Sequence, residues 1–120
     1  MAHSYRELIA WQKGMNFVTE VYRITISFPR EETYGLTSQL RRAAISVPSN
    51  IAEGQARYSR REFRRFLTVA RGSLAELETL IMLAASLEYV TSETARCLLS
   101  KTEELGRILN GLISSTKSAA

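Results

Sequence analysis

The stretch YGLTSQLRRAAISVPSNIAEGQARYSRREFRRFL, residues 34–67, decides the fold of this 120-residue chain. Its apolar residues recur every three or four positions, which is typical of one face of a helix. Pro48 nevertheless stands inside the pattern, and a dense run of arginines follows it. The stretch raises two questions: what a proline does within a helix, and whether the arginines form a binding surface or only a solvated face.

The first half of the stretch predicts a helix that begins at Thr37 as N-cap and loosens or ends at Gly54. Pro48 has no backbone N–H, and its ring would meet the carbonyl group of Ala44, so a kink is expected there. The residues expected on the core face of this helix are Leu40, Ala44, Val47 and Ile51.

The second half of the stretch predicts the start of a third helix. Ser59 and Glu62 have the spacing of a capping box, in which each side chain accepts a hydrogen bond from the other residue's backbone N–H. A wide apolar stripe then continues to Leu87, and a fourth helix is expected to begin near Thr91.

Before the stretch, residues 5–28 predict a helix with two apolar rows, ended by Pro29. The row expected to face the core comprises Leu8, Trp11, Met15, Val18 and Tyr22. The second row, on an adjacent face, comprises Phe17, Val21, Ile24 and Phe28. A helix in a small monomeric bundle needs one such stripe, so the second row suggests a further contact.

The chain lacks strand signals, since no segment sustains the alternation of apolar and polar residues that a strand requires. Long helices joined by short connections are expected to be antiparallel neighbours. The sequence therefore predicts an all-α protein: an antiparallel up-down four-helix bundle with its second helix kinked at Pro48, formed by residues 1–120 as a single domain.

The composition argues against an enzyme. The chain has no aspartate, and His3 is its only histidine, so it offers no Ser-His-Asp set and no histidine-rich metal site. No glycine-rich phosphate loop precedes a helix. We therefore predict no catalytic residue, metal, cofactor or small-molecule substrate. Cys97 is interpreted as an apolar packing residue, and Trp11 as a core or interface anchor.

The sequence also bears on the cellular compartment. No run of about eighteen apolar residues is present, so no membrane partner is expected. Charges occupy the N-terminal positions where a secretory signal needs an apolar run, and the single cysteine can form no intrachain disulfide. A cytoplasmic protein is expected.

The positive charge is concentrated in the middle third of the chain. The net charge of the chain is +4, whereas residues 41–71 hold eight arginines against Glu53 and Glu62. Arginines at this spacing repel one another, and they crowd a helix N-terminus, where the helix dipole disfavours cations. Two local costs favour a function for them, and phosphate is the obvious anion to bind. The alternative is a solvated face, neutralised by glutamates of a neighbouring helix or subunit.

The candidate nucleic-acid-binding residues are Arg57, Arg60, Arg61, Arg64, Arg65 and Arg71, with Arg41 and Arg42 as further candidates. Tyr58 lies beside them, and its ring is suited to stack on an unpaired base.

Three blocks carry a resemblance to a known family: YRELIAWQKGM (residues 5–15), YGLTSQLRRAAISVPSNIAEG (34–54) and FRRFLTVARGSLAELET (63–79). Together they resemble small bacterial four-helix-bundle proteins, the best known of which are encoded inside intervening sequences of large-subunit ribosomal RNA genes. The resemblance implies a cytoplasmic bundle that assembles into a ring-like homopentamer. The chain is more distantly similar to the accessory protein of diversity-generating retroelements, a basic pentamer that binds nucleic acid and a reverse transcriptase.

A cyclic ring needs two different patches that meet on neighbouring subunits. The candidates for these patches are Phe17, Ile24, Phe28, Leu80 and Leu83. The alternative is that these residues close a wide core, because periodicity alone does not separate the two roles. In such an assembly, a kink at Pro48 would re-aim the segment from Arg57 to Arg65.

Two functions follow from these observations. The first is a non-catalytic, oligomeric protein that binds RNA or DNA, above all structured RNA, by its backbone and with little sequence specificity. The second is a protein-interaction scaffold, whose arginines pair with acidic groups of a partner or of a neighbouring subunit. Replacing Arg61, Arg64 and Arg65 with glutamate distinguishes them, because only the first predicts lost RNA binding with an intact oligomer.

Overall fold

The computed structural model describes residues 4–117, which form four long helices and two short 3₁₀ turns and contain no strand. In chain order the elements are η1 (Tyr5–Glu7), α1 (Ile9–Thr25), η2 (Arg30–Glu32), α2 (Leu36–Ala56), α3 (Arg60–Ser86) and α4 (Ser92–Lys117). The predicted all-α four-helix bundle is confirmed. Within residues 4–117, no helix is long and apolar enough to cross a membrane.

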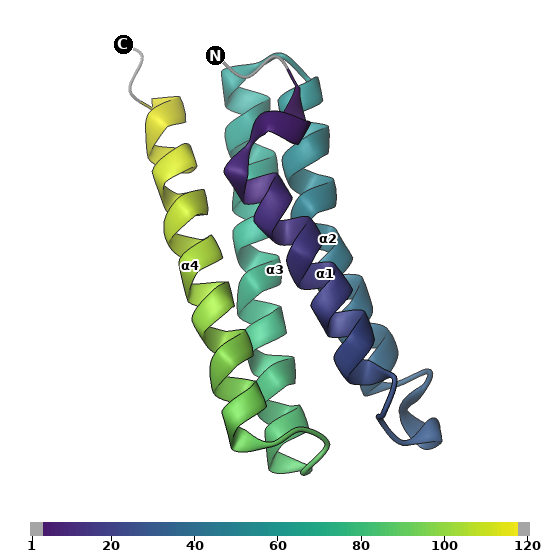
Figure 1. Ribbon diagram of the computed structural model, residues 1–120. Coiled ribbons are helices and arrows are strands. Elements are labelled where there is room, and N and C mark those ends of the chain that lie inside the picture. Colours follow the sequence, from purple (N-terminus) through teal and green to yellow (C-terminus); the bar gives the residue numbers. More distant parts are fainter. Residues whose placement is uncertain (1–3, 118–120) are drawn as a thin grey trace.

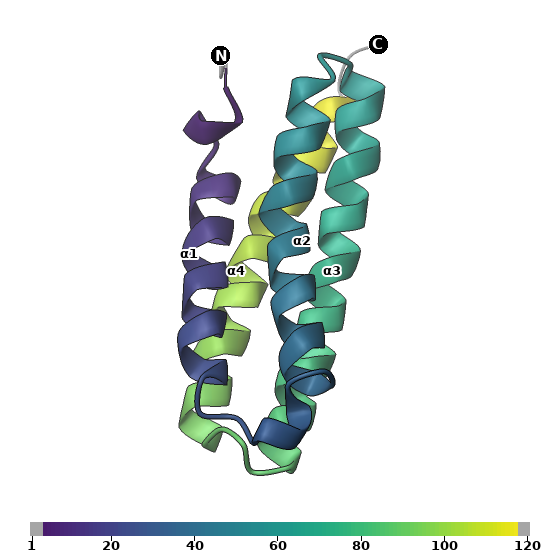
Figure 2. The same cartoon turned by 90° about the vertical axis from the view of Figure 1, so that its right-hand side faces the viewer.

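The helices run alternately up and down along a rod of 49 × 22 × 19 Å (Figure 1). The α2–α3 turn and the last turn of α4 lie at one end of the rod, and the α1–α2 connection and the α3–α4 turn lie at the other (Figure 2). The contact between α2 and α3 is the most extensive, whereas that between α1 and α4 is the smallest of the four helix pairs in contact. Ion pairs of Lys13 with Glu104 and of Lys101 with Glu20 bridge this last seam.

The core face of α1 is the second of the two apolar rows, so the predicted order of the rows is wrong. The buried residues of α1 are Ala10, Gly14, Phe17, Val21 and Thr25. Met15 and Tyr22, from the row expected to face the core, are 44% and 39% exposed. Periodicity finds both rows but does not rank them, whereas the small residues on the buried row let α1 lie close to α2.

Pro48 lies inside an uninterrupted α2 and is buried. A Cβ atom added to Gly14 would lie 3.4 Å from the Cβ and Cδ atoms of Pro48, so the glycine in α1 makes room for the proline ring. Next to the proline, the Asn50 side-chain amide donates a hydrogen bond of 2.8 Å to the carbonyl oxygen of Ser46. The proline therefore marks the α1–α2 contact and does not end the helix. The kink remains a prediction.

The start of α2 differs from the prediction. Gly35 is the N-cap, and Thr37 is a buried residue inside the helix. The cap is supplied from the preceding turn, because Glu32 Oε1 accepts a hydrogen bond of 3.0 Å from the backbone N–H of Leu36. A carboxylate at a helix N-terminus also interacts favourably with the helix dipole.

Two predicted helix ends also move. The first helix stops at Thr25, before the expected Phe28. The second continues past Gly54 to Ala56, because this glycine serves a close approach between helices instead of an end. A Cβ atom at position 54 would lie 2.7 Å from the Cβ atom of Phe66, so only a residue without a side chain lets α2 and α3 meet there.

Three of the predicted interface residues lie in the core of the single chain. Phe17, Phe28 and Leu80 are buried, and Ile24 packs partly buried against the same core. These four follow the alternative of a wide core, because helices of their own chain cover them. Leu83, by contrast, is 47% exposed and remains available to a second molecule.

Candidate nucleic-acid interface

Most of the candidate arginines gather where α2 ends and α3 begins. The topology also brings the last residue of α4, Lys117, to this end of the rod (Figure 1). We call six residues the basic end: Arg57, Arg60, Arg61, Arg64, Arg65 and Lys117. Glu53 and Glu62 accompany them, so the basic residues exceed the acidic ones by four in this group.

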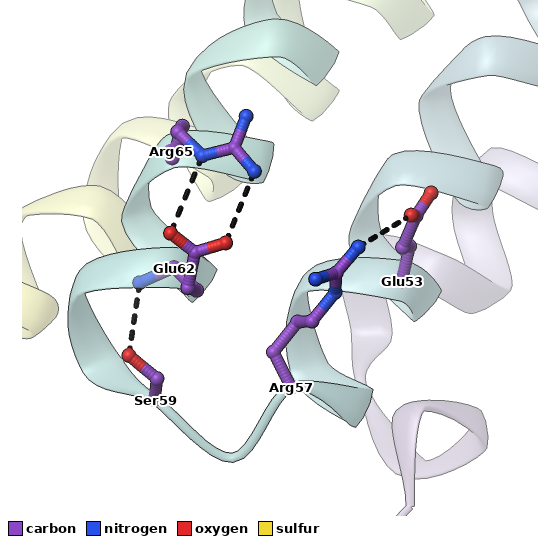
Figure 3. Close-up of polar contacts among 5 residues, drawn as sticks. All are labelled: Glu53, Arg57, Ser59, Glu62 and Arg65. Atoms are coloured by element: carbon purple, nitrogen blue, oxygen red, sulfur yellow. Dashed lines mark hydrogen bonds and ion pairs between the residues drawn. The ribbon is translucent and has the colours of Figure 1, made fainter.

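Ser59 fixes where α3 begins and therefore where its arginines lie. The Ser59 hydroxyl accepts a hydrogen bond of 3.2 Å from the backbone N–H of Glu62 (Figure 3). This is the first half of the predicted capping box. The Glu62 carboxylate does not complete the box but binds Arg65, accepting hydrogen bonds of 3.0 and 3.4 Å from Nη2 and Nε.

Glu62 and Arg65 form an ion pair at the basic end, with 3.0 Å between Oε1 and Nη2. The hydrogen bond from Arg65 lowers the pKa of Glu62 below its ordinary value, and the charges of Arg65, Arg57 and Arg61 lower it further. The same bond raises the pKa of Arg65. Glu62 is consequently ionised at neutral pH and offsets the charge of Arg65, whose guanidinium also lies over the ring of Phe66, 4.5 Å from its centroid.

Arg57 makes a similar local pair at the end of α2. Its guanidinium lies 3.0 Å from the Glu53 carboxylate (Figure 3). The same group lies 5.1 Å from the centroid of the Phe66 ring. About half of each charged side chain of the pair is exposed, at 48% and 55%. Exposed pairs of this kind contribute only about 0–1 kcal/mol, so another anion can replace the carboxylate.

Two candidate arginines reach across to α4 instead of along their own helix. Arg64 is half-buried and donates a hydrogen bond of 3.3 Å to the carbonyl oxygen of Thr116, at the C-terminal end of α4. Arg71 donates one of 3.0 Å to the side-chain oxygen of Asn110. Both acceptors are uncharged, so these two hydrogen bonds join α3 to α4 without a negative charge that offsets either arginine.

Arg60 and Arg61 are the two arginines of the basic end whose charged groups have no partner in the described part of the chain. They are the first two residues of α3, and both side chains are exposed. Neither guanidinium forms an ion pair or hydrogen bond within residues 4–117. These two side chains are therefore free to bind an external anion without first breaking a contact.

Arg41 and Arg42 do not belong to the basic end, because sixteen residues of helix place Arg41 about 24 Å from Arg57. Arg41 is half-buried against α1, where its Nε donates a hydrogen bond of 2.9 Å to the Thr25 hydroxyl. Its guanidinium lies 4.3 Å from the centroid of the Tyr22 ring. Arg42 is exposed beside a shallow groove on α2 and α3. Arg41 is therefore best explained as a packing residue between helices.

Tyr58 forms the turn between α2 and α3. Its φ angle of 53° lies in the left-handed region, which is common for glycine but costs a residue with a Cβ atom about 1–2 kcal/mol. Its position, directly after the C-cap Arg57, is the one where glycine is usual. The side chain is 86% exposed, so the chain itself gives the ring almost no burial in return.

The opposite end of the rod is acidic. Glu31 and Glu32 lie in η2, Glu88 follows α3, and Glu93 lies in the first turn of α4, whereas the basic residues of η2 and of the last turn of α1 are Arg30 and Arg23. Neither this separation of charge nor the place of Lys117 was predicted from the sequence. The place of Lys117 could have been predicted from the up-down topology, because that topology requires the end of the fourth helix to lie beside the start of the third.

No group of three side chains able to hold a metal ion occurs among residues 4–117, and His3 lies outside them. Cys97 is exposed, which corrects its interpretation as a packing residue. Trp11 is partly buried, and its ring lies 5.4 Å from that of Tyr5.

The comparison with protein families gives a direct result. Residues 6–111 match the family described as 23S rRNA-intervening sequence protein. The chain belongs to this family. The resemblance drawn from the three sequence blocks is thereby confirmed. Apart from Lys117, the basic end lies within the matched residues of this intervening-sequence protein.

Comparison with solved structures supports the fold. The crystal structure of a protein with unknown function, from the S23 ribosomal protein family of Bacteroides thetaiotaomicron, is similar with a TM-score of 0.81. The two chains are 21% identical, and the similarity covers 88% of this chain and 96% of the other. At this identity the likeness shows a shared fold. No curated protein matches the sequence.

Proposed function

We propose that this intervening-sequence protein is a non-catalytic, cytoplasmic protein that binds structured RNA by its phosphate backbone at the basic end. The observation that carries the proposal is the pair of exposed arginines, Arg60 and Arg61, which have no partner among the described residues. Arginine suits this ligand because its planar guanidinium can donate two hydrogen bonds to one phosphate group.

The neighbouring residues strengthen the attraction. Arg64 binds a neutral carbonyl group, and Arg57 makes a surface ion pair that a phosphate group can replace. With Lys117 at the end of α4, the basic end combines charges from three helices. Contacts of this kind hold the backbone of a nucleic acid but read little of its sequence.

The proposal is tested by fluorescence anisotropy with a labelled RNA hairpin at several salt concentrations. If about four phosphate groups are contacted, the logarithm of the binding constant should fall against the logarithm of salt with a slope of about −3 to −4. The double change Arg60→Glu and Arg61→Glu should abolish binding and leave the oligomer intact.

A matched control carries the same charge change elsewhere. Arg96 and Arg107 are exposed on α4, outside the basic end, and replacing both with glutamate should leave most of the affinity. Absence of RNA binding by the unaltered protein at low salt would refute the proposal. Loss of assembly or of an acidic protein partner, with no effect on RNA, would favour the alternative of a protein-interaction scaffold.

A second candidate, assembly of the chain with copies of itself, is supported by exposed apolar side chains on α3. Val69 and Leu83 share one face of α3 and are 45% and 47% exposed, and the C-cap residue Leu87, which continues this face, is 51% exposed. We propose that the homopentamer implied by the family resemblance uses this face, with Leu83 in the contact. Light scattering should then give about five times the 13.5 kDa chain mass, and a smaller mass for Leu83→Glu. A monomeric unaltered protein would contradict this.

A further inference from the structure

Tyr58 has a side chain that the fold of the single chain does not explain. Its backbone lies in the left-handed region at a position suited to glycine, and its ring is 86% exposed. The ring has no aromatic or cation–π partner among the described residues. A glycine or an asparagine would make the same turn with less strain.

The surroundings of Tyr58 indicate what the ring is suited to bind. It directly follows Arg57 and precedes Ser59, after which Arg60 and Arg61 open α3. Figure 3 draws the turn between Arg57 and Ser59. Ser59 caps the N–H of Glu62, so the backbone N–H groups of residues 60 and 61 are left for an outside acceptor. An exposed aromatic ring is thus followed, two and three positions along the chain, by two free guanidinium groups at a helix N-terminus.

Nucleic acid with unpaired bases matches this combination. Phosphate groups suit Arg60 and Arg61, and the face of an unpaired base suits an exposed aromatic ring. Paired bases are already stacked inside a duplex, where the ring cannot reach their faces. A duplex would therefore contact the arginines but not the ring of Tyr58.

We propose that Tyr58 stacks on an unpaired base of an RNA strand whose neighbouring phosphate groups lie on Arg60 and Arg61. This inference rests on the proposed function and adds a ligand class to it: RNA with nucleotides that are free of base pairing, as in a loop or a bulge. It also explains why a strained tyrosine occupies the tip of the turn.

The test compares two RNA probes with the same stem. One has a single-stranded loop that carries a fluorescent 2-aminopurine, and in the other a complementary strand pairs the loop. Tyr58→Asn is the informative variant, because asparagine tolerates the left-handed backbone and removes the ring. Tyr58→Phe keeps the ring, and Tyr34→Ala removes a tyrosine that is 96% exposed in the α1–α2 connection.

We expect Tyr58→Asn to weaken binding of the open loop about tenfold, equivalent to about 1.4 kcal/mol, and to leave binding of the paired probe unchanged. The 2-aminopurine emission should be quenched by the unaltered protein and by Tyr58→Phe and Tyr34→Ala, but not by Tyr58→Asn. If Tyr58→Asn binds the open loop as tightly as the unaltered protein does, with binding still dependent on Arg60 and Arg61, the inference alone is overturned. No binding of either probe by the unaltered protein would overturn the proposed function and the inference together.

Discussion

The hydroxyl group of Tyr89 donates a hydrogen bond of 3.0 Å to Oε2 of Glu32, across 57 positions of the sequence. The other oxygen of the same carboxylate accepts the 3.0 Å bond from the N–H of Leu36 that caps α2. Glu32 therefore has two functions: it supplies the N-terminal cap of one helix, and it joins the α1–α2 connection to the α3–α4 turn.

Replacing Glu32 with alanine should lower the free energy of unfolding by about 1–2 kcal/mol. Loss of a helix N-cap alone has a typical cost within this range, and the Tyr89 hydroxyl would lose its partner as well. Urea denaturation followed by circular dichroism measures the change. Glu31→Ala removes the neighbouring, exposed carboxylate and should have a much smaller effect. Equal effects of the two changes would contradict the role assigned to Glu32.

The contribution of Tyr89 should depend on pH at the alkaline end. The hydrogen bond to Glu32 raises the pKa of Tyr89 above its ordinary value of 10.0. The folded protein thus favours the protonated phenol, so its contribution to stability is fully present below pH 10 and is lost as the pH rises through the raised pKa. The stability difference between the unaltered protein and Tyr89→Phe should accordingly shrink above pH 10. An unchanged difference at high pH would show that the bond does not form in solution.

Two glycine-to-alanine changes should have opposite effects on the free energy of unfolding. Gly54→Ala places a methyl group 2.7 Å from the Cβ atom of Phe66, so the helices must separate, and we expect a loss of about 1–3 kcal/mol. Gly72 lies inside α3 with nothing within 4 Å of its added Cβ atom. Gly72→Ala should therefore stabilise the protein by about 0.5–1 kcal/mol through helix propensity. Thermal unfolding of both variants measures the two changes in stability.

The Glu62 carboxyl group should titrate below its ordinary pKa of 4.5, because Arg65 binds the ionised form. Its contribution to stability is then present above about pH 4.5 and is lost as the pH falls through the lowered pKa. Carbon-detected NMR of the side-chain carboxyl group measures the midpoint. Arg65→Gln should raise it markedly, whereas Arg61→Gln should raise it less, because Arg61 acts through its charge without a hydrogen bond. The same midpoint in all three proteins would rule out the pair.

Local patterns in the sequence were sufficient for the helices and for parts of the basic end. Ser59 is predicted as a cap from its spacing to Glu62. The ion pairs of Arg57 with Glu53 and of Arg65 with Glu62 were not predicted, although each joins residues three or four positions apart. Patterns of this kind depend on one helix turn and are readable from the chain alone.

Contacts between distant segments were not readable in this way. The bond from Arg64 to Thr116 joins residues 52 positions apart, and it requires the packed bundle to bring them together. The core row of α1 was misjudged for the same reason: the choice depends on Gly14 meeting Pro48, a contact between two helices. Glu32 replaced Thr37 as the source of the cap because a turn outside the helix positioned its carboxylate.

The excess of basic residues at one tip and of glutamates around η2 and the α3–α4 turn at the other should give the molecule an electric dipole along its 49 Å axis. A dipole experiences a torque in an external field, so the rod turns before it touches anything charged. Near a polyanion at low ionic strength, the tip with the α2–α3 turn should face the polyanion and the opposite tip should point away from it. Orientation during diffusion is thus set by the placement of charge at the two tips, and it fades as salt shortens the range of the field.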